Sequence, residues 1–511
     1  MNHDGRVPAQ KNRLVIIILA LSLLRLLYIG LTPLDLSPDE AHYWEWSRHL
    51  DWSYYSKGPA VAYVIAMTTA VFGQTAFGVR AGAVFFSALA SYLIYLFGKD
   101  IFDDEKTGFY AALLSMAIPF FSIGGILITT DVLFIFFWTA AFFCIKRGLD
   151  TEKQLWWCLA GAATGFGFLS KYTMVFIYPA LFFFLLASRG DKRWLKRKEP
   201  YIAFAISLVF MIPVIYWNLT HGEVTIRHTM GQAHLGEGGF SLTSPLEFLG
   251  SQFLLITPLL FIGLVYAAWK AGVDGFKGKN SGLLFVFFSS VPLFLFFLAK
   301  SVHGKVQANW AVAAYVPLLP AVVFLFLRLF KESGRSARRR LRAVAGLAIG
   351  LGVGASFVAY FPWTVEMLTG RDAMKGAPFN RVTDWRELGE KVSDVRDAMG
   401  RAFVMSDTYQ ITSELAFYTR GNPSAYNVDT GQRRMNQYDL WPGFDGLTGQ
   451  NAVYVKGGDA SIEPMVAEAF DSCGRELFTI YRGGRADKDF SIFSCYNFKG
   501  MKGQASGHGR F

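Results

Sequence analysis

Apolar segments of bilayer-spanning length recur through the first 361 residues of the chain, and few folds accommodate them. A helix of roughly 20 apolar residues crosses the hydrocarbon core of a membrane, and apolar residues fill 52% of the 511 positions. We therefore predict a polytopic α-helical membrane protein with about eleven spanning helices, at 14–34, 78–98, 107–124, 131–148, 155–170, 172–188, 201–218, 248–270, 282–299, 309–330 and 343–361.

Basic residues in two connecting loops predict the orientation. Residues 189–199 carry six Lys or Arg against two acids, and residues 331–342 carry six against one. Short loops with such an excess remain in the cytoplasm. In a bacterial inner membrane this places the N-terminus in the cytoplasm and residues 35–77 on the periplasmic side. The same clustering accounts for the net charge of +11 without a nucleic-acid partner.

One short apolar segment, residues 59–72, decides the count of spans. It has only about 14 residues, fewer than the roughly 20 needed to cross a bilayer. Counting it as a span would invert all later loops against the charge rule. We predict an interfacial or re-entrant helix here.

The apolar segments stop after residue 361, which predicts two domains. Residues 1–361 form the membrane domain, with an outer loop at 35–77, and residues 362–511 form a soluble α/β domain outside. Its predicted strands and helices lie at 403–407, 451–458, 477–484 and 490–498, and at 384–399 and 411–418.

The four cysteines form two groups by their position in the chain. Cys144 and Cys158 lie in or beside apolar segments, without a spacing typical of zinc ligands. Cys473 and Cys495 fall in the outer domain, where thiols oxidise. A disulfide and two buried free thiols are both consistent with the sequence of this second pair.

Carboxylates gather next to the membrane in the loop from Ser37 to Pro59. Asp39 and Glu40 follow Pro38, and Glu45 follows one turn later. Acids in a first helical turn are favoured by the helix dipole, so a structural and a catalytic interpretation stand side by side. Asp131 has the same two interpretations, as a helix cap or as a group that faces the same site.

Cations also lie at the outer ends of apolar segments, where the positive-inside rule does not place them. Lys57 and Lys171 either extend toward lipid headgroups or bind an anion. The outer loops add Arg227, His228 and His303. Together, carboxylates and cations at one face predict a site that binds a phosphate and removes a proton.

Several motifs carry a family resemblance. The stretch PDEAHYWEWS is followed by the turn SKGP at 56–59, by Phe72 and Gly73, and by Arg80. This pattern resembles the C-type membrane glycosyltransferases, in the bacterial branch related to protein O-mannosyltransferases and to the aminoarabinose transferase that modifies lipid A. The resemblance continues through LSKYT and NWAVAAYVPLLP, and into the outer domain at SDTYQITSELAFY and RRMNQYDLW. The turn departs from the usual KPP or HPP at Gly58.

The resemblance implies a GT-C fold and an inverting glycosyltransferase. Its donor would be a polyprenyl-phosphate-linked sugar, and its acceptor lipid A, lipopolysaccharide or another envelope molecule on the periplasmic face. By position, Asp39 matches the general base and Lys57 a cation near the donor phosphate. We predict Asp39, Glu40 and Asp131 as catalytic residues and assign donor phosphate binding to Lys57, Lys171, Arg227, His228 and His303, the last three from loop location alone.

The sequence is also consistent with two other functions. A protein O-glycosyltransferase would share the donor chemistry and differ in acceptor. A lipid-linked sugar transporter would show inverted repeats and charges near the middle of the bilayer, which the sequence lacks. We expect no obligatory metal, with Mg²⁺ or Mn²⁺ on the loop carboxylates as the alternative.

Overall fold

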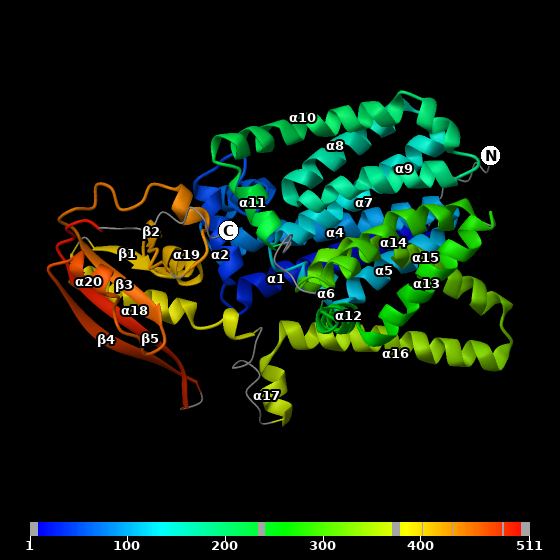
Figure 1. Cartoon of the computed structure of the whole chain (residues 1–511). Helices are drawn as coiled ribbons and strands as arrows, with labels where there is room; N and C mark the ends of the chain where they lie inside the picture. The colour runs from blue at the N-terminus through cyan, green and yellow to red at the C-terminus, as the bar shows by residue number, and fades with distance from the viewer. Residues whose placement is uncertain are drawn as a thin grey trace.

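The structure is a computed structural model that describes residues 9–232, 241–278, 280–369, 379–400, 402–431, 433–482 and 485–501. A long bundle of helices carries a small sheet domain at one end (Figure 1). The helices of the bundle and its outer face are α1 (Ala9–Leu31), α2 (Pro38–Arg48), α3 (Ala60–Phe72), α4 (Ala76–Phe102), α5 (Glu105–Ala117), α6 (Pro119–Ile123), α7 (Thr130–Thr151), α8 (Gln154–Ser170), α9 (Ile177–Ala187), α10 (Glu199–Thr220), α11 (Val224–Gln232), α12 (Thr243–Ile256), α13 (Pro258–Phe276), α14 (Ser281–Ser301), α15 (Tyr315–Glu332), α16 (Arg335–Tyr360) and α17 (Trp363–Thr369).

Within the described residues, eight helices are long and apolar enough to cross a membrane, which makes this a multi-pass membrane protein. Three other predicted spans consist of shorter pieces: α5 followed by α6, α8 alone, and a 3₁₀ turn at Tyr172–Phe176 followed by α9. The helix α3 has 13 residues, in keeping with its exclusion from the predicted spans.

The predicted span at 248–270 is wrong, because the chain breaks inside it. The helix α12 ends at Ile256, and Thr257 has a φ of 80° before Pro258 begins α13. Proline disfavours a helical conformation in the residue before it and donates no hydrogen bond. The span here is α13, which runs to Phe276.

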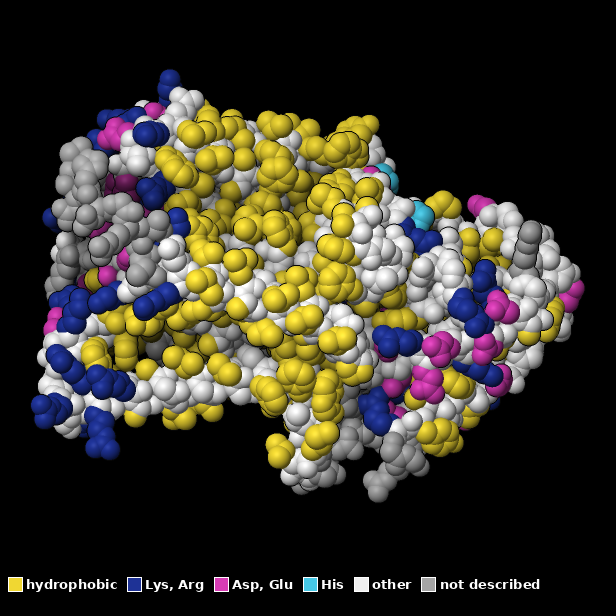
Figure 2. Space-filling model, turned by 180° about the vertical axis from the view of Figure 1, so that it is seen from behind, with side chains coloured by type: hydrophobic (Ala, Val, Ile, Leu, Met, Phe, Trp, Pro, Cys, Tyr) yellow, Lys and Arg dark blue, Asp and Glu magenta, His cyan; other side chains and the backbone are white. Residues whose placement is uncertain are grey.

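Apolar side chains cover the long sides of the bundle, and Lys and Arg side chains gather at the end opposite the sheet domain (Figure 2). This end holds the basic loops at 189–199 and 331–342. The apolar belt and the charged end together match a protein that sits across a membrane.

The C-terminal part is an α/β domain. Its strands are β1 (Ala402–Ser406), β2 (Ala425–Asn427), β3 (Asn451–Gly457), β4 (Ser472–Arg482) and β5 (Arg485–Tyr496), and its helices are α18 (Trp385–Ala398), α19 (Tyr409–Tyr418) and α20 (Pro464–Glu468). The strand order is β2-β1-β3-β5-β4, with the first three parallel and the last two antiparallel. Four strands and two helices were predicted, and β2 was not. Residues 483 and 484 of the predicted strand 477–484 lie outside the described residues.

The sequence left open whether Cys473 and Cys495 pair, and the structure joins them. They face each other directly on the antiparallel strands β4 and β5 and form a disulfide. The alternative of two buried free thiols is therefore wrong.

The outer helix α2 joins the two parts. One apolar core runs from α2, α3 and the outer ends of α4 and α7 into α18, α19 and the sheet. Figure 1 shows α2 and α19 between the bundle and the strands. The sheet domain is therefore packed onto the outer loop at 35–77.

Candidate functional site

The start of α2 separates two adjacent carboxylates. Ser37 caps the helix, and Glu40 closes a capping box by accepting a hydrogen bond from the Ser37 N–H (3.0 Å). Neighbouring residues of a helix point about 100° apart. Glu40 therefore faces the bundle, while Asp39 faces outward.

Glu40 is fully buried and ion-paired. It accepts hydrogen bonds from Arg80 Nε (3.0 Å), from Arg80 Nη2 (2.9 Å) and from the Ile128 N–H (3.1 Å). The residue is absent from the described lining of the outer cavity. This corrects the placement predicted for it: Glu40 ties α2 to α4 and to the turn before α7.

Asp39 lines an outer cavity of about 670 Å³, which we call the polar cavity. Its side chain is 47% exposed, its Oδ1 accepts a hydrogen bond from the Tyr409 hydroxyl (3.3 Å), and its Oδ2 lies 4.0 Å from Arg381. The ionisable residues that line this cavity are Asp39, His42, Tyr43, Tyr55, Lys57, Asp131, Lys171, His228, Arg381, Asp407, Tyr409, Arg433 and Arg434.

Asp131 lies on the membrane side of the polar cavity. The side chain of Thr129 caps α7 by accepting from the Asp131 N–H, so the Asp131 carboxylate is available for other contacts. It accepts hydrogen bonds from Lys171 Nζ (2.7 Å) and from Asn309 Nδ2 (2.6 Å). Of its two predicted interpretations, facing the site is the one that the structure has.

Lys171 has its place at the end of α8, where the helix gives way to a 3₁₀ turn. Its ammonium also lies 5.5 Å from the centre of the Phe134 ring. The side chains of Lys171 and Asp131 are only 16% and 10% exposed, so the charge of Lys171 is balanced mainly by its ion pair with Asp131 and little by water.

Lys57 reaches the polar cavity from the SKGP turn. The next residue is a glycine for a steric reason: a Cβ at Gly58 would lie 2.2 Å from the carbonyl oxygen of Leu169 in α8. Burial, and then the charge of Lys171, lower the pKa of Lys57. Among the described residues, no side chain forms a hydrogen bond or an ion pair with its ammonium.

Of the other three predicted cations, the structure brings His228 to the polar cavity and leaves Arg227 and His303 away from its described lining. His228 lines the polar cavity and packs against the Tyr55 ring (4.6 Å), but burial and the charges of Lys57 and Arg434 lower its pKa to about 4, so it is neutral at pH 7. Arg227 and His303 are exposed and are not among the described residues that line this cavity. Their predicted place at the donor phosphate is corrected accordingly.

The outer domain supplies residues that the sequence reasoning missed. Tyr409 begins α19, Arg381 precedes α18, and Arg433 and Arg434 follow β2. Arg433 is held by a bidentate ion pair with Asp439. The motifs SDTYQITSELAFY and RRMNQYDLW were the available signal. Nothing in them indicated that Tyr409 contacts Asp39, which lies 370 residues earlier in the chain.

Charge in the polar cavity is unbalanced. Its lining has five cationic side chains, of Lys57, Lys171, Arg381, Arg433 and Arg434, against the carboxylates of Asp39, Asp131 and Asp407. An excess of positive charge in a partly closed cavity attracts anions.

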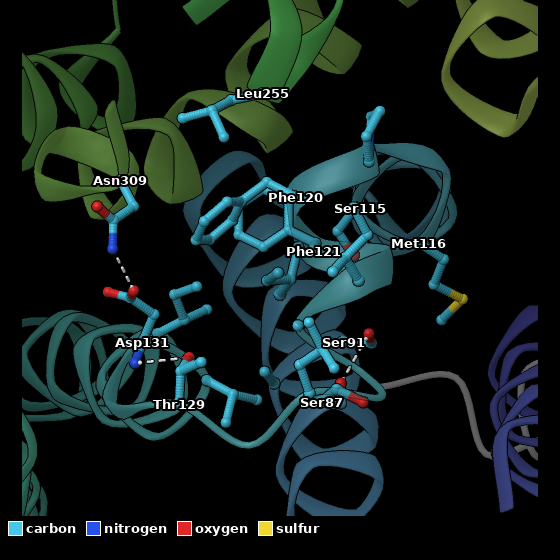
Figure 3. A pocket seen from close by; sticks show the side chains of 18 of the residues that line it. Ser87, Ser91, Ser115, Met116, Phe120, Phe121, Thr129, Asp131, Leu255 and Asn309 are labelled. Carbon is cyan, nitrogen blue, oxygen red and sulfur yellow. Dashed lines mark hydrogen bonds between the residues drawn. The ribbon is translucent and has the colours of Figure 1, made fainter. Parts of the chain in front are cut away.

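A second cavity of about 340 Å³, which we call the inner cavity, lies next to the first. Both are lined by Thr129, Asp131 and Asn309. Figure 3 shows Asp131 and Asn309 on one side of the inner cavity, with Phe120 and Phe121 beside it. Most of its lining is apolar, which suits a lipid chain or a membrane-facing group.

The structure offers no clustered metal ligands among the residues it describes: no three or more His, Cys, Asp or Glu side chains are placed to hold one ion. The cationic side chains of the polar cavity are the groups available there to neutralise an anion.

Comparisons with known proteins agree on the fold. Residues 56–217 match the family model for dolichyl-phosphate-mannose-protein mannosyltransferase. A lipid A galacturonosyltransferase of Rhizobium johnstonii is 28% identical over 408 residues, which cover 79% of this chain and 82% of the relative. An undecaprenyl phosphate-alpha-4-amino-4-deoxy-L-arabinose arabinosyl transferase of Pseudomonas fluorescens is 24% identical over 343 residues, 61% of this chain and 58% of the relative.

Solved structures show the same architecture. ArnT from Cupriavidus metallidurans bound to undecaprenyl phosphate superposes with a TM-score of 0.62 at 16% identity, covering 94% of this chain and 97% of ArnT. The oligosaccharyltransferase AglB of Archaeoglobus fulgidus has a TM-score of 0.56 at 12% identity, covering 87% of this chain and 69% of AglB. The predicted GT-C fold with a C-terminal sheet domain is confirmed.

Proposed function

We propose that the chain is a membrane glycosyltransferase of the C type, as its similarity to protein O-mannosyltransferases and lipid A aminoarabinose transferases indicates, and that it moves a sugar from a polyprenyl phosphate to lipid A or a related envelope acceptor. The observation that carries this proposal is the juxtaposition of Asp39 and Lys57 in the polar cavity. One group takes up a proton, and the other has a positive charge without a partner among the described residues.

The reaction follows from these two groups. Asp39 accepts the proton of the acceptor hydroxyl as the oxygen attacks the anomeric carbon of the sugar. The bond from that carbon to the phosphate oxygen breaks, and the negative charge that appears on the polyprenyl phosphate is stabilised by the ammonium of Lys57. Attack from the face opposite the phosphate inverts the anomeric carbon. Lys171 and Asp131 line the same cavity and act as supporting residues.

The charge of the polar cavity favours an acidic sugar. One relative transfers a galacturonosyl group and others transfer an amino sugar. A uronic acid carries a carboxylate and an amino sugar carries an ammonium, and the five cationic side chains against three carboxylates attract the first and repel the second. Arg434 is exposed to the cavity and, among the described residues, has no ion-pair partner, which makes it the group for a sugar carboxylate.

We also propose the bacterial inner membrane as the location, with the N-terminus in the cytoplasm and the sheet domain in the periplasm. The basic loops at the far end of the bundle support this orientation. The disulfide between Cys473 and Cys495 supports an oxidising compartment for the sheet domain.

Transfer without an obligatory metal is part of the proposal, because Lys57 and its neighbours supply the charge that a Mg²⁺ or Mn²⁺ ion would otherwise bring. Activity that disappears with a chelator and returns with either ion would contradict it.

The experiment uses purified full-length protein with a polyprenyl-phosphate-linked uronic acid and lipid A, and measures release of polyprenyl phosphate. Release should depend on the acceptor and should fall by about 10²–10⁴-fold in Asp39→Asn, the usual contribution of a general base. Asp407→Asn is the matched control, because Asp407 lines the same cavity but lies 3.8 Å from Lys456. Equal turnover in the wild type and in Asp39→Asn would refute the assignment of Asp39 as the general base.

A protein acceptor is the second candidate, and the match of residues 56–217 to a protein mannosyltransferase family favours it. Mass spectrometry of envelope lipids and glycoproteins, with and without the gene, distinguishes the two. A sugar missing from proteins and retained on lipid A would select the protein acceptor.

A further inference from the structure

Arg25 is a buried cation that the reaction described above does not use. It lies in the spanning helix α1, the residue is 4% exposed, and it lines the inner cavity. A charge at this depth costs several kcal/mol unless it is compensated. The groups that contact Arg25 therefore indicate whether this charge is balanced within the protein.

The guanidinium of Arg25 has only neutral partners. Nε donates to the Tyr360 hydroxyl (3.3 Å), Nη1 donates to Ser87 Oγ (3.1 Å), and Nη2 donates to the Ser122 carbonyl oxygen (3.4 Å). A guanidinium has five N–H donors. Two donors and the full charge stay unmatched, since no carboxylate of a described residue forms an ion pair with Arg25.

The backbone is shaped around this side chain. A Cβ at Gly125 would lie 2.4 Å from Cζ of Arg25 and 2.5 Å from its Nη1. Any larger residue at position 125 would displace the guanidinium. Gly125 therefore provides the space in which Arg25 reaches the inner cavity.

Among the described residues that line the inner cavity, no other cation competes for an anion. The other ionisable group of its lining is Asp131, whose oxygens already accept from Lys171 and Asn309. Ser87 and Ser91 belong to α4 and are separate from Asp131 of α7 (Figure 3), and Ser87 is the serine that Arg25 contacts. Arg25 lines the inner cavity and not the polar cavity, whereas Lys57, to which the donor phosphate is assigned, lines the polar cavity and not the inner one.

The inner cavity also opens toward the membrane. Leu254 of α12 is part of its lining and is 82% exposed, on the apolar surface of the bundle. Phe120 and Ile123 of α6, which packs against α12, also belong to this lining. The apolar lining of the inner cavity therefore reaches the bilayer-facing surface of the bundle at α12.

We propose that the inner cavity holds the anionic group of the acceptor lipid, with its phosphate on Arg25 and its reacting hydroxyl directed toward Asp131 and the polar cavity. The proposal rests on the glycosyl transfer proposed above. It assigns the two lipids to separate cations, the donor phosphate to Lys57 and the acceptor phosphate to Arg25.

The kinetic test uses full-length protein in nanodiscs with lipid A and with chemically dephosphorylated lipid A. Arg25→Gln should raise the KM for phosphorylated lipid A by about tenfold or more, the loss of one charge-assisted contact, with the donor KM unchanged. Gly125→Ala should do the same, and Arg25→Lys should recover part of the affinity. Arg13→Gln, the same change at an exposed position of α1, is the matched control.

Two kinetic outcomes would overturn the inference. A rise in the donor KM with an unchanged acceptor KM would assign Arg25 to the donor phosphate. An equal loss with phosphorylated and dephosphorylated lipid A would make Arg25 a structural residue of the bundle.

A binding measurement separates this inference from the proposed reaction. Native mass spectrometry of the intact protein should show a preference for phosphorylated over dephosphorylated lipid A, and Arg25→Gln should abolish it. Preference without any sugar transfer would refute the reaction and retain the site. Absence of the preference in the wild type would refute the site.

Discussion

Replacing Glu40 by Gln tests whether the second carboxylate of α2 acts in folding or in chemistry. The substitution preserves size and removes one buried charge. Oε1 accepts from Arg80 Nε and from the Ile128 N–H, while Oε2 accepts from Arg80 Nη2 and from the Ser37 N–H. An amide replaces one of these oxygens by an NH₂ group, so in either orientation two N–H donors lose their acceptor.

The expected cost follows from these contacts. Each buried donor without an acceptor costs about 1–3 kcal/mol, and breaking a buried ion pair by removing one partner costs about 3–5 kcal/mol. Both routes predict a loss of a few kcal/mol in the free energy of unfolding. Turnover of the folded fraction should also fall, because Asp39 is the neighbour of Glu40 on the first turn of α2.

The assay is unfolding of the purified protein in detergent, followed by tryptophan fluorescence. Glu332→Gln is the matched control: Glu332 pairs with Arg328, but the two side chains are 62% and 58% exposed. Exposed ion pairs contribute at most about 1 kcal/mol. A Glu40→Gln protein that unfolds like the wild type and yet has lost turnover would refute the structural role and restore the predicted catalytic one.

Three further predictions concern the outer face. Burial and the charge of Lys171 lower the pKa of Lys57, so its ammonium loses a proton below pH 10.5 and the donor KM should rise with pH in that range. Lys57→Arg should move this rise to higher pH. An unchanged pH profile in Lys57→Arg would contradict the prediction. Burial raises the pKa of Glu45 to about 8, so between pH 4.5 and about 8 the folded state binds a proton that the unfolded state has lost. The free energy of unfolding should therefore fall as pH rises through this range, by up to about 1.4 kcal/mol per pH unit. This pH dependence should be absent in Glu45→Gln, and its retention would assign it to another group. Changing Cys473 and Cys495 to Ser together should destabilise the sheet domain by about 2–5 kcal/mol, and identical hydrogen exchange in β4 and β5 would show that the disulfide adds nothing.

Sequence patterns predicted the parts of the fold that depend on local composition. Apolar length identified the spans, and short runs of β-forming residues identified four strands of the outer sheet. The break at Thr257 was missed because the apolar character continues across it, and only the conformational effect of Pro258 interrupts the helix. The strand β2 has three residues, too few for a periodic pattern.

The site was predictable only as a collection of residue types. Asp39 and Glu40 are adjacent and chemically alike, and their roles diverge because one points to the cavity and the other to Arg80. That direction depends on where α4 lies, which a single sequence does not reveal. Arg227 and His303 lie outside the described lining of the polar cavity for the same reason, since a position in a segment between spans does not tell where a side chain points.

The outer domain positions Asp39 and is therefore part of the site. The hydroxyl of Tyr418 accepts from the Leu36 N–H (2.8 Å), and the hydroxyl of Ser413 donates to the Pro38 carbonyl oxygen (3.3 Å). These contacts hold the start of α2 from outside, while the Glu40–Arg80 pair holds it from inside the bundle. Because α19 carries both Tyr418 and Ser413 and begins at Tyr409, which contacts Asp39, a shift of this helix moves the carboxylate and its hydrogen-bond partner together. An acceptor that pushes α19 outward is therefore expected to change the hydrogen bond from Tyr409 to Asp39, the base proposed above.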